Sequence, residues 1–194
     1  MDESARYSGS QEDIEESAAP GQLELVRRFV NTLELENGGY DHLATLDGLS
    51  EWLREWDLPN PQLSERDRER AIELREAVRS QLVDEDDGES CKETTRRLNE
   101  AVADADLRVV FSEDGSTQLV PACEGFEATL ARIAIAIREA MLVGDWDRLK
   151  VCGSDDCRWA YYDRSRNHSR NWCRMQECGN RAKVRAFRER RSGI

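Results

Sequence analysis

The stretch VCGSDDCRWAYYDRSRNHSRNWCRMQECGNRAKVRAFRERR, residues 151–191, decides how the C-terminal part of the chain folds. It contains two C-x4-C pairs separated by fifteen residues: Cys152, Cys157, Cys173 and Cys178. Two such loops joined by a short spacer let four thiolates reach one zinc ion, which takes four sulfur ligands at about 2.3 Å in a tetrahedron. The sequence therefore predicts one structural Zn²⁺ bound by these four cysteines, with no coordination position left open for catalysis.

The alternative for this segment is four unrelated buried cysteines, but so short a stretch builds little core without a crosslink. His168 could replace one cysteine as a ligand, although it lies in the middle of the polar spacer. Between the pairs, residues 159–172 are predicted to form two short strands around a polar turn. Cys91 and Cys123 have no cysteine partner at short range, so we expect both to be ordinary packing residues.

Charge is divided unevenly along the chain, whose formal net charge is −12 over 194 residues. Residues 151–194 contain eleven basic and five acidic side chains, a net charge of +6. Residues 1–150 contain 17 basic and 35 acidic side chains, a net charge of −18. This asymmetry predicts an acidic body that carries a basic module suited to an anionic partner.

The residues after Cys178 are predicted to form an arginine-rich helix. At about 100° per residue, Arg181, Arg185 and Arg188 fall within roughly 60° of one another on one helix face. Arginine suits phosphate oxygens and the guanine edge in the major groove of DNA. The predicted DNA-binding residues are Arg164, Arg166, Arg170, Arg181, Lys183, Arg185, Arg188, Arg190 and Arg191. Pairing of these arginines with the acidic body is the alternative, and it stays open, as does alternation between the two.

The rest of the chain is predicted to be mainly helical. Residues 1–20 are acidic and poor in apolar side chains, so we expect a disordered tail. Leu23, Val26, Val30 and Leu33 share one helical face, and that helix is predicted to end at Asn37-Gly38-Gly39.

Further helices are predicted over 47–58, 64–82, 91–105 and 126–143, with Ser64 and Asp67 as a capping box and Gly144 as a stop. One hairpin is predicted over 107–122, where two apolar runs flank Asp114-Gly115. The predicted fold class is α+β. Residues 21–150 form a mainly helical N-terminal domain with one β-hairpin, and residues 151–194 form a small zinc-bound β-hairpin and helix.

No membrane segment or secretory signal is predicted. The most apolar run, LARIAIAIREAMLV at 130–143, is interrupted by charges and falls short of the roughly 20 apolar residues that span a bilayer. The acidic N-terminus lacks the apolar core of a secretory signal. We therefore expect a cytoplasmic protein with no membrane partner, whose reduced cysteines bind metal. No enzyme is expected, because a metal-dependent nuclease needs converging histidines and carboxylates, and the only histidines are His42 and His168.

The run WCRMQECGNRAK, residues 172–183, resembles the CGNR zinc finger, which is named after the motif seen here at 178–181. Residues 21–150 resemble the ABATE domain usually found before it, through LVRRFVNTLE, LSEWL and AIELREAV. The resemblance implies a stress-induced transcriptional regulator with four zinc-binding cysteines. Asn31 and Thr32 match the Asn-Thr pair of that family. Either they line a ligand pocket, or Asn31 bonds to the backbone of a neighbouring turn.

The leading hypothesis is a DNA-binding transcriptional regulator. Its zinc finger presents the arginine-rich helix to DNA, and its N-terminal domain senses a small-molecule effector or forms a homodimer. The alternative is a zinc-bound module that binds RNA or a protein. In that case Trp159, Tyr161, Tyr162 and Trp172 would stack on bases, unless they form the core of the module. The acidic body departs from the usual appearance of the family and would weaken attraction to phosphate.

Overall fold

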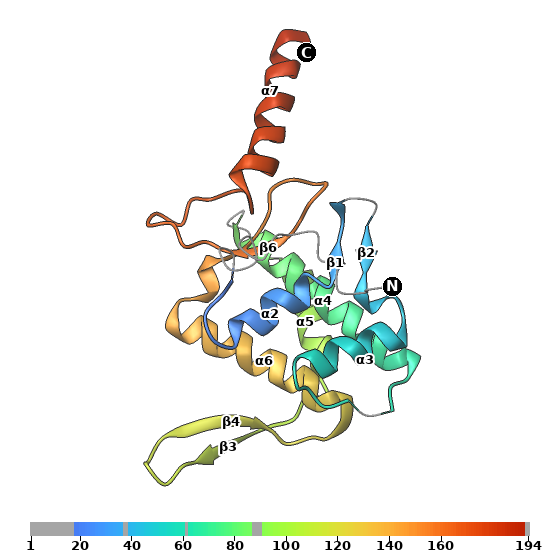
Figure 1. Cartoon of the computed structure of the whole chain (residues 1–194). Coiled ribbons are helices and arrows are strands. Elements are labelled where there is room, and N and C mark those ends of the chain that lie inside the picture. Colours follow the sequence, from blue (N-terminus) through green and yellow to red (C-terminus); the bar gives the residue numbers. More distant parts are fainter. Residues whose placement is uncertain (1–17, 37–38, 61, 87–90, 193–194) are drawn as a thin grey trace.

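The computed structural model describes residues 18–36, 39–60, 62–86 and 91–192, and within them the chain is α+β and mostly helical, as predicted (Figure 1). Its α-helices are α2 (Leu23–Val30), α3 (Leu46–Glu55), α4 (Glu65–Asp86), α5 (Lys92–Ala101), α6 (Gly125–Val143) and α7 (Asn180–Ser192). Two 3-10 turns, η3 (His42–Ala44) and η4 (Trp146–Arg148), and a π-helical turn, η5 (Met175–Gly179), complete the helical elements. None of the helices described is long and apolar enough to cross a membrane.

The strands form three separate antiparallel pairs. They are β1 (Leu33–Glu34) with β2 (Tyr40–Asp41), β3 (Leu107–Phe111) with β4 (Thr117–Pro121), and β5 (Leu149–Val151) with β6 (Ala160–Tyr162). The predicted hairpin at 107–122 is confirmed. Gly115 takes φ 83° in its turn, and the Ser116 N–H donates to Asp114 Oδ1 at 2.9 Å. This hairpin and α7 project from opposite ends of the body (Figure 1).

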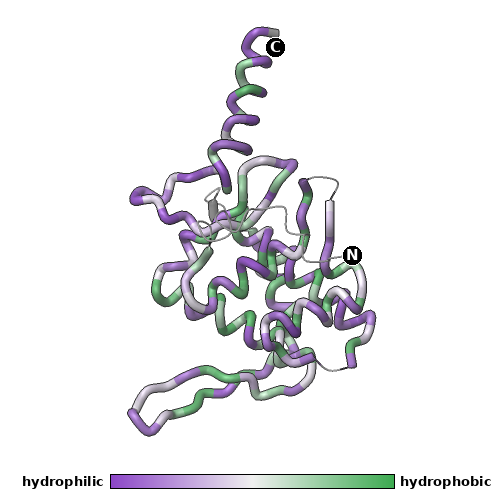
Figure 2. The backbone as a smooth tube through the Cα atoms, in the orientation of Figure 1, coloured by the Kyte–Doolittle hydropathy of each residue, from purple (hydrophilic) through white to green (hydrophobic). Residues whose placement is uncertain are grey.

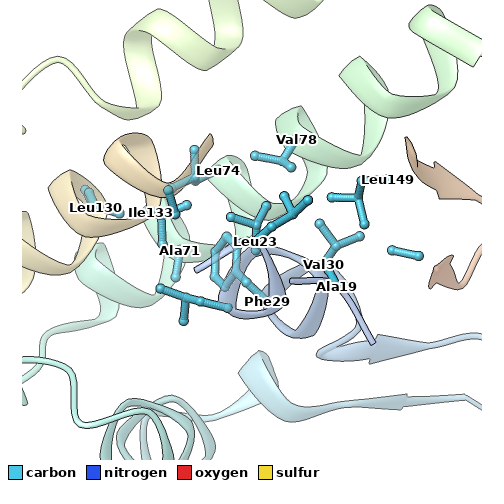
Figure 3. Packing of buried hydrophobic residues seen from close by; sticks show 14 of the residues in the cluster. Ala19, Leu23, Phe29, Val30, Ala71, Leu74, Val78, Leu130, Ile133 and Leu149 are labelled. Atoms are coloured by element: carbon cyan, nitrogen blue, oxygen red, sulfur yellow. The ribbon is translucent and has the colours of Figure 1, made fainter. Parts of the chain in front are cut away.

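One apolar core unites the helices of the body. Figure 3 shows Phe29 and Val30 of α2 in one cluster with Leu74 and Val78 of α4 and Ile133 of α6. α2 is short but strongly one-sided, with buried positions recurring along its core face. The predicted capping box of α4 is confirmed by hydrogen bonds between Ser64 and Asp67, and α6 ends at Gly144 with φ 78°, as predicted.

The predicted tail, residues 1–20, lies almost wholly outside the described residues. Of its last three residues, which are described, Ala19 packs on the body: it is 7% exposed and belongs to the core. The Ala19 N–H also donates to Glu24 Oε2 at 2.8 Å. The packed chain therefore already includes residues 18–20.

The first helix is shorter than predicted, and the prediction was wrong at its C-terminal end. α2 ends at Val30, and Leu33 lies in β1, opposite Asp41 of β2. The body thus contains a second, very short hairpin that the sequence did not predict; Asn37 and Gly38, at the predicted helix end, lie outside the described residues. The chain leaves the helix because Asn31 and Thr32 bond outside it: the His42 N–H donates to the Thr32 carbonyl at 2.8 Å.

The spacer between the cysteine pairs also differs from the prediction. Residues 159–172 do not form two strands; only β6 is a strand, and it pairs with β5 across the first cysteine pair. Residues 163–174 contain no strand because their backbone is organised by the side chain of Asp163, which accepts hydrogen bonds from two of its loop's N–H groups. The predicted boundary between residues 150 and 151 consequently falls inside β5.

The β5–β6 pair is part of the core of the body. Leu149, Val151, Ala160 and Tyr162 all belong to the same buried apolar cluster as α2, α4 and α6. The C-terminal module is therefore not suspended from a linker. It shares buried surface with the body, and this fixes its position.

Asn31 joins the body to the module in the manner of a strand partner. Its Nδ2 donates to the Ala160 carbonyl at 2.8 Å, and the Ala160 N–H donates to its Oδ1 at 2.7 Å. Both residues are buried. The Asn31 side chain therefore satisfies both the N–H and the C=O of Ala160. Without Asn31, these two backbone groups of β6 would lack hydrogen-bond partners.

Two buried arginines of α4 make further connections. Arg79 Nη1 donates to the Arg158 carbonyl of the module and Nη2 donates to the Val30 carbonyl at the end of α2, both at 2.6 Å. Arg75 Nη1 lies 2.5 Å from Asp41 Oδ1, and this ion pair joins α4 to β2. Buried guanidinium groups are stable only when paired, so these contacts constrain how α2, β2 and the module meet.

We predict that Asn31→Ala destabilises the protein by about 2–4 kcal/mol, because it leaves the buried N–H and C=O of Ala160 without partners. Denaturant unfolding measures the loss. Asn60→Ala is the matched control, since Asn60 is exposed and, among the described residues, hydrogen-bonds only to Ser50; its cost should be below about 1 kcal/mol. Equal losses for the two variants would contradict the role assigned to Asn31.

Candidate metal centre

The four cysteine sulfurs lie within 4.8 Å of one another, and all four residues are buried. Cys173 Sγ is 3.6 Å from Cys157 Sγ and 3.7 Å from Cys178 Sγ. Sulfurs bound to a tetrahedral zinc at about 2.3 Å would be roughly 3.8 Å apart. The four side chains therefore fit one structural Zn²⁺ in both chemistry and spacing, as the sequence predicts.

The ionisation of the thiols favours a bound cation. Hydrogen bonds from Cys157 and Cys173 lower the pKa of Cys152, because they stabilise its thiolate. The same hydrogen bond raises the pKa of Cys157, and burial raises the pKa of Cys178. A bound dication would favour the thiolate form of all four cysteines.

Backbone contacts position the first cysteine pair. Cys152 directly follows β5, and its N–H donates to the Trp159 carbonyl at 2.9 Å. The Gly153 N–H donates to the Asn171 carbonyl at 2.9 Å, and a Cβ on Gly153 would lie only 3.2 Å from that oxygen. The absence of a side chain there lets the first pair approach the chain that leads into the second.

The second pair ends in η5, which leads directly into α7. A Cβ on Gly179 would lie 2.4 Å from Met175 Sδ and 3.1 Å from Trp172 Cδ1, so a larger residue would displace both side chains. Asn180 Nδ2 donates to the Gln176 carbonyl at 2.8 Å and satisfies a carbonyl of the π-helical turn. The Gly-Asn dipeptide therefore shapes the turn that carries Cys178 into the helix.

Arg181 completes the motif by contacting a cysteine ligand. Its Nη2 donates to Cys178 Sγ at 3.0 Å, and it forms an ion pair with Glu36, which follows β1 in the body. Because four thiolates and one Zn²⁺ carry a net charge of about −2, the guanidinium offsets charge at the metal. In this arrangement Arg181 orients a ligand and joins the module to the body, which is one of the alternatives that the sequence leaves open.

Asp163 shapes the arginine-rich loop between the cysteine pairs. Its side chain is buried and accepts hydrogen bonds from the Ser165 N–H (2.9 Å) and the Arg170 N–H (3.0 Å). Burial alone would raise the pKa of Asp163, but these hydrogen bonds outweigh burial and lower it. The ionised carboxylate therefore closes the loop that presents Arg164 and Arg166.

The three loop arginines have different surroundings. Arg164 Nη2 donates to the Ala18 carbonyl at 2.8 Å, and Arg170 Nη2 donates to the Cys173 carbonyl at 2.6 Å. Arg166 is exposed and has no hydrogen-bond or ion-pair partner among the described residues. Arg170 therefore supports the metal-binding loop, whereas Arg166 is available to an external anion.

The basic residues of α7 differ in the same way. They are Arg181, Lys183, Arg185, Arg188, Arg190 and Arg191, and all are exposed. Arg185 forms an ion pair with Asp156 of the first cysteine loop at 3.0 Å. Lys183 and Arg190 have no hydrogen-bond or ion-pair partner within the described part of the chain. They are seven residues apart, so they lie about 20° from each other on one face.

α7 projects away from the rest of the molecule. In Figure 1 it extends outward from the module, and Figure 2 shows that it is hydrophilic over most of its length. Its principal packing partner is η5. The metal site and the π-helical turn therefore support the helix at one end and leave most of its surface accessible.

Asn31 and Thr32 are fully occupied by protein contacts. The bonds of Asn31 to β6 are described above. Thr32 Oγ1 donates to the Phe29 carbonyl at 2.8 Å and accepts from Arg75 Nη1 at 3.2 Å. The two residues are 2% and 0% exposed, respectively. Their geometry supports the structural alternative for this pair.

Three residues that shape the site were missed by the sequence analysis, and two of them carry no signal in the sequence. Glu36 and Arg79 reach the module from the body, across more than 70 intervening positions, so no local pattern could identify them. Asp163 is different: an aspartate two residues before a serine is typical of a side-chain-closed turn, and that signal was present.

Two family models match the chain. The model described as "CGNR zinc finger" matches residues 148–191, and the ABATE model, described as "Putative stress-induced transcription regulator", matches residues 23–144. No curated protein matches the chain. The two families and their order are those that the sequence resembles, which confirms that prediction.

We predict about one zinc per chain by metal analysis, and loss of α7 and of the 163–174 loop when a chelator removes it. Removing a residue that hydrogen-bonds to a metal ligand weakens metal binding roughly 10–100-fold. Cys173→Ser removes a ligand itself, so it should weaken zinc binding by more than this. Cys91→Ser and Cys123→Ser are matched controls, because both residues lie outside the cluster. Hydrogen exchange would locate the loss; retention of full protection in α7 after zinc removal would contradict the assignment.

Proposed function

Because the chain belongs to the ABATE family, we propose that it is a cytoplasmic transcription regulator whose zinc-bound module binds DNA. The family match supports regulation, and the four-cysteine cluster supports a zinc finger. The reduced thiols required for zinc binding are typical of the cytoplasm. No catalytic step is part of the proposal, since an ion with four thiolate ligands has no open position.

The exposed basic helix is the observation that carries DNA binding. Six of the 13 residues of α7 are Arg or Lys, and one is acidic. A helix of this length spans about 20 Å, and the major groove, about 12 Å wide, admits an α-helix. Isolated helices shorter than about 12–15 residues are marginal in water. Anchoring at η5 therefore gives α7 the fixed direction that groove binding requires.

The accessible cations define the proposed contact surface. Arg166 in the loop and Lys183 and Arg190 in α7 are exposed and have no protein partner among the described residues. Arg181 and Arg185 are occupied by Glu36 and Asp156. We assign the first three to phosphate contacts and the last two to holding the module in place, with the acidic partners competing against DNA for them.

A protein-interaction module is the second candidate. Val184 and Phe187 of α7 are 48% and 53% exposed, which is unusual for apolar residues on a basic helix. Base stacking as in RNA binding has less support, since Tyr161 and Tyr162 are buried. Trp172 packs against the cysteine cluster.

Fluorescence anisotropy with duplex DNA tests the proposal. The log–log salt slope should be about −0.9 per phosphate contact, and changing Lys183 and Arg190 together to Gln should make it shallower by about 1.8. The matched control changes Arg54 and Arg66, exposed arginines of the body, to Gln.

The control removes the same charge, so its slope should equal that of the wild type. Identical slopes for both double variants would show that α7 is not the contact surface. Retention of single-stranded RNA or of a protein, with no binding to duplex DNA, would favour the second candidate.

We also propose that the body forms a homodimer through the β3–β4 hairpin. Leu107, Val109, Phe111 and Leu119 share one face of this two-stranded sheet, and Phe111 is 77% exposed. A lone hairpin is marginally stable in water. A second copy is the fitting occupant, because two identical hairpins packed face to face about a two-fold axis would cover the apolar face of each.

Replacing both Val109 and Phe111 by Ser should convert the dimer to a monomer, as measured by light scattering after size-exclusion chromatography. The matched control replaces Leu142 and Val143, exposed apolar residues at the end of α6, by Ser and should remain dimeric. If the wild-type chain is still monomeric at about 100 µM, the dissociation constant of any dimer is weaker than about 100 µM. That result would overturn this assignment.

A further inference from the structure

A cavity of about 170 Å³ lies on the body, between α4, α5 and α6. Leu74 and Val78 of α4 are fully buried and form its floor. Leu98 and Val102 of α5 and Ile137 of α6 line its walls. The surface offered to an occupant is therefore almost entirely aliphatic.

The size of the cavity selects a small occupant. Ala134 supplies only a methyl group at a wall position of α6, where a larger side chain would fill the space. Engineered cavities of about 150 Å³ with similar aliphatic and aromatic linings remain dry and bind benzene. A space of this volume therefore accepts one aromatic ring, but not a fused ring system or a nucleotide.

The exposed side of the cavity is polar and positively charged. Gln81, Asn99 and Arg138 line it, and Arg138 is an exposed residue with no hydrogen-bond or ion-pair partner among those described. An apolar interior with a few polar groups at one end is typical of a ligand site. Because Arg138 is positively charged, we expect the polar end of the occupant to be an anion. A carboxylate fits best, since its two oxygens match the planar guanidinium.

We propose that this cavity binds a single-ring aromatic carboxylate, with the ring against Leu74 and Val78 and the carboxylate toward Arg138. In the proposed regulator, this cavity would be the effector site and an aromatic carboxylate would be the effector. This assignment depends on that proposal only for the consequence of binding, because binding itself is measured in the absence of DNA.

The site is close in sequence and in space to the DNA-binding module. Trp146 of η4 lines the cavity and is buried. Two residues later, the Arg148 carbonyl accepts from the Asp163 N–H at 2.7 Å, and Arg148 Nη2 donates to the Ser165 carbonyl at 3.2 Å. An occupant that moves Trp146 therefore acts on the loop that presents Arg166.

Binding is tested with the zinc-loaded full chain by NMR, following the indole signal of Trp146. Benzoate is the probe, and its dissociation constant should be on the order of 0.1–1 mM for so small a ligand. Benzyl alcohol has the ring without the charge and should bind about two- to fivefold more weakly, the value of one exposed ion pair. Acetate has the charge without the ring and should cause no shift.

Variants place the site. Ala134→Leu fills the cavity and should abolish benzoate binding, and Met141→Trp should block it from the rim. Because Met141 is 47% exposed, its replacement leaves the core intact if Ala134→Leu should fail to fold. Arg138→Gln should reduce benzoate affinity to that of benzyl alcohol, while Arg66→Gln on the exposed start of α4 should have no effect.

No shift of Trp146 with benzoate or benzyl alcohol would overturn the site, and equal affinity for the two would overturn the role of Arg138. Unchanged benzoate binding in Met141→Trp would also overturn the location. The consequence is measured separately: benzoate should change the DNA affinity of the wild type at least twofold and leave that of Met141→Trp unchanged. A chain that binds benzoate but no DNA would contradict the proposed function and leave the site standing.

Discussion

The convergence of four cysteine sulfurs within 4.8 Å is the constraint on which the C-terminal part of the molecule depends. It joins the two cysteine loops, and it fixes the first turn of α7 through η5. Four thiolates cannot remain charged at this distance without a cation, because each raises the cost of ionising the next. Metal binding, loop closure and the direction of the helix are consequently a single event.

The module depends on the body as much as on its metal. β5 and β6 lie in the same apolar core as α2, α4 and α6. Asn31 and Arg79 then supply directional bonds across that shared surface. Apolar burial contributes most of the free energy but does not determine orientation. The buried hydrogen bonds do, since any other arrangement would leave their polar groups without partners. A change inside the body can therefore reach the module without a flexible hinge.

The basic residues of the module fall into two groups: some pair with groups of the protein, and others are exposed to solvent without a described partner. The acidic body and the basic module attract each other, and Arg181 shows the result: it lies between the Cys178 sulfur and the carboxylate of Glu36. The side chains of Arg181 and Glu36 are 49% and 24% exposed, so salt partly screens this contact. Arg166, Lys183 and Arg190 are exposed and have no hydrogen-bond or ion-pair partner among the described residues. The formal charge of residues 151–194 therefore overstates the positive charge that is available to an external anion. The position of each basic residue along α7 matters more than the total charge.

The sequence by itself determined the metal-binding cysteines, the helical body, the β3–β4 hairpin and the two families, because each is encoded by local spacing or periodicity. It predicted a helix too long at Leu33 and a hairpin in the wrong place after Trp159, since both depend on where Asn31 and Asp163 find partners. Only the tertiary structure decided which arginines are paired, what Asn31 contacts and where a cavity remains between α4, α5 and α6. These features arise from residues far apart in the chain, and their energies come from burial and geometry that no local pattern records.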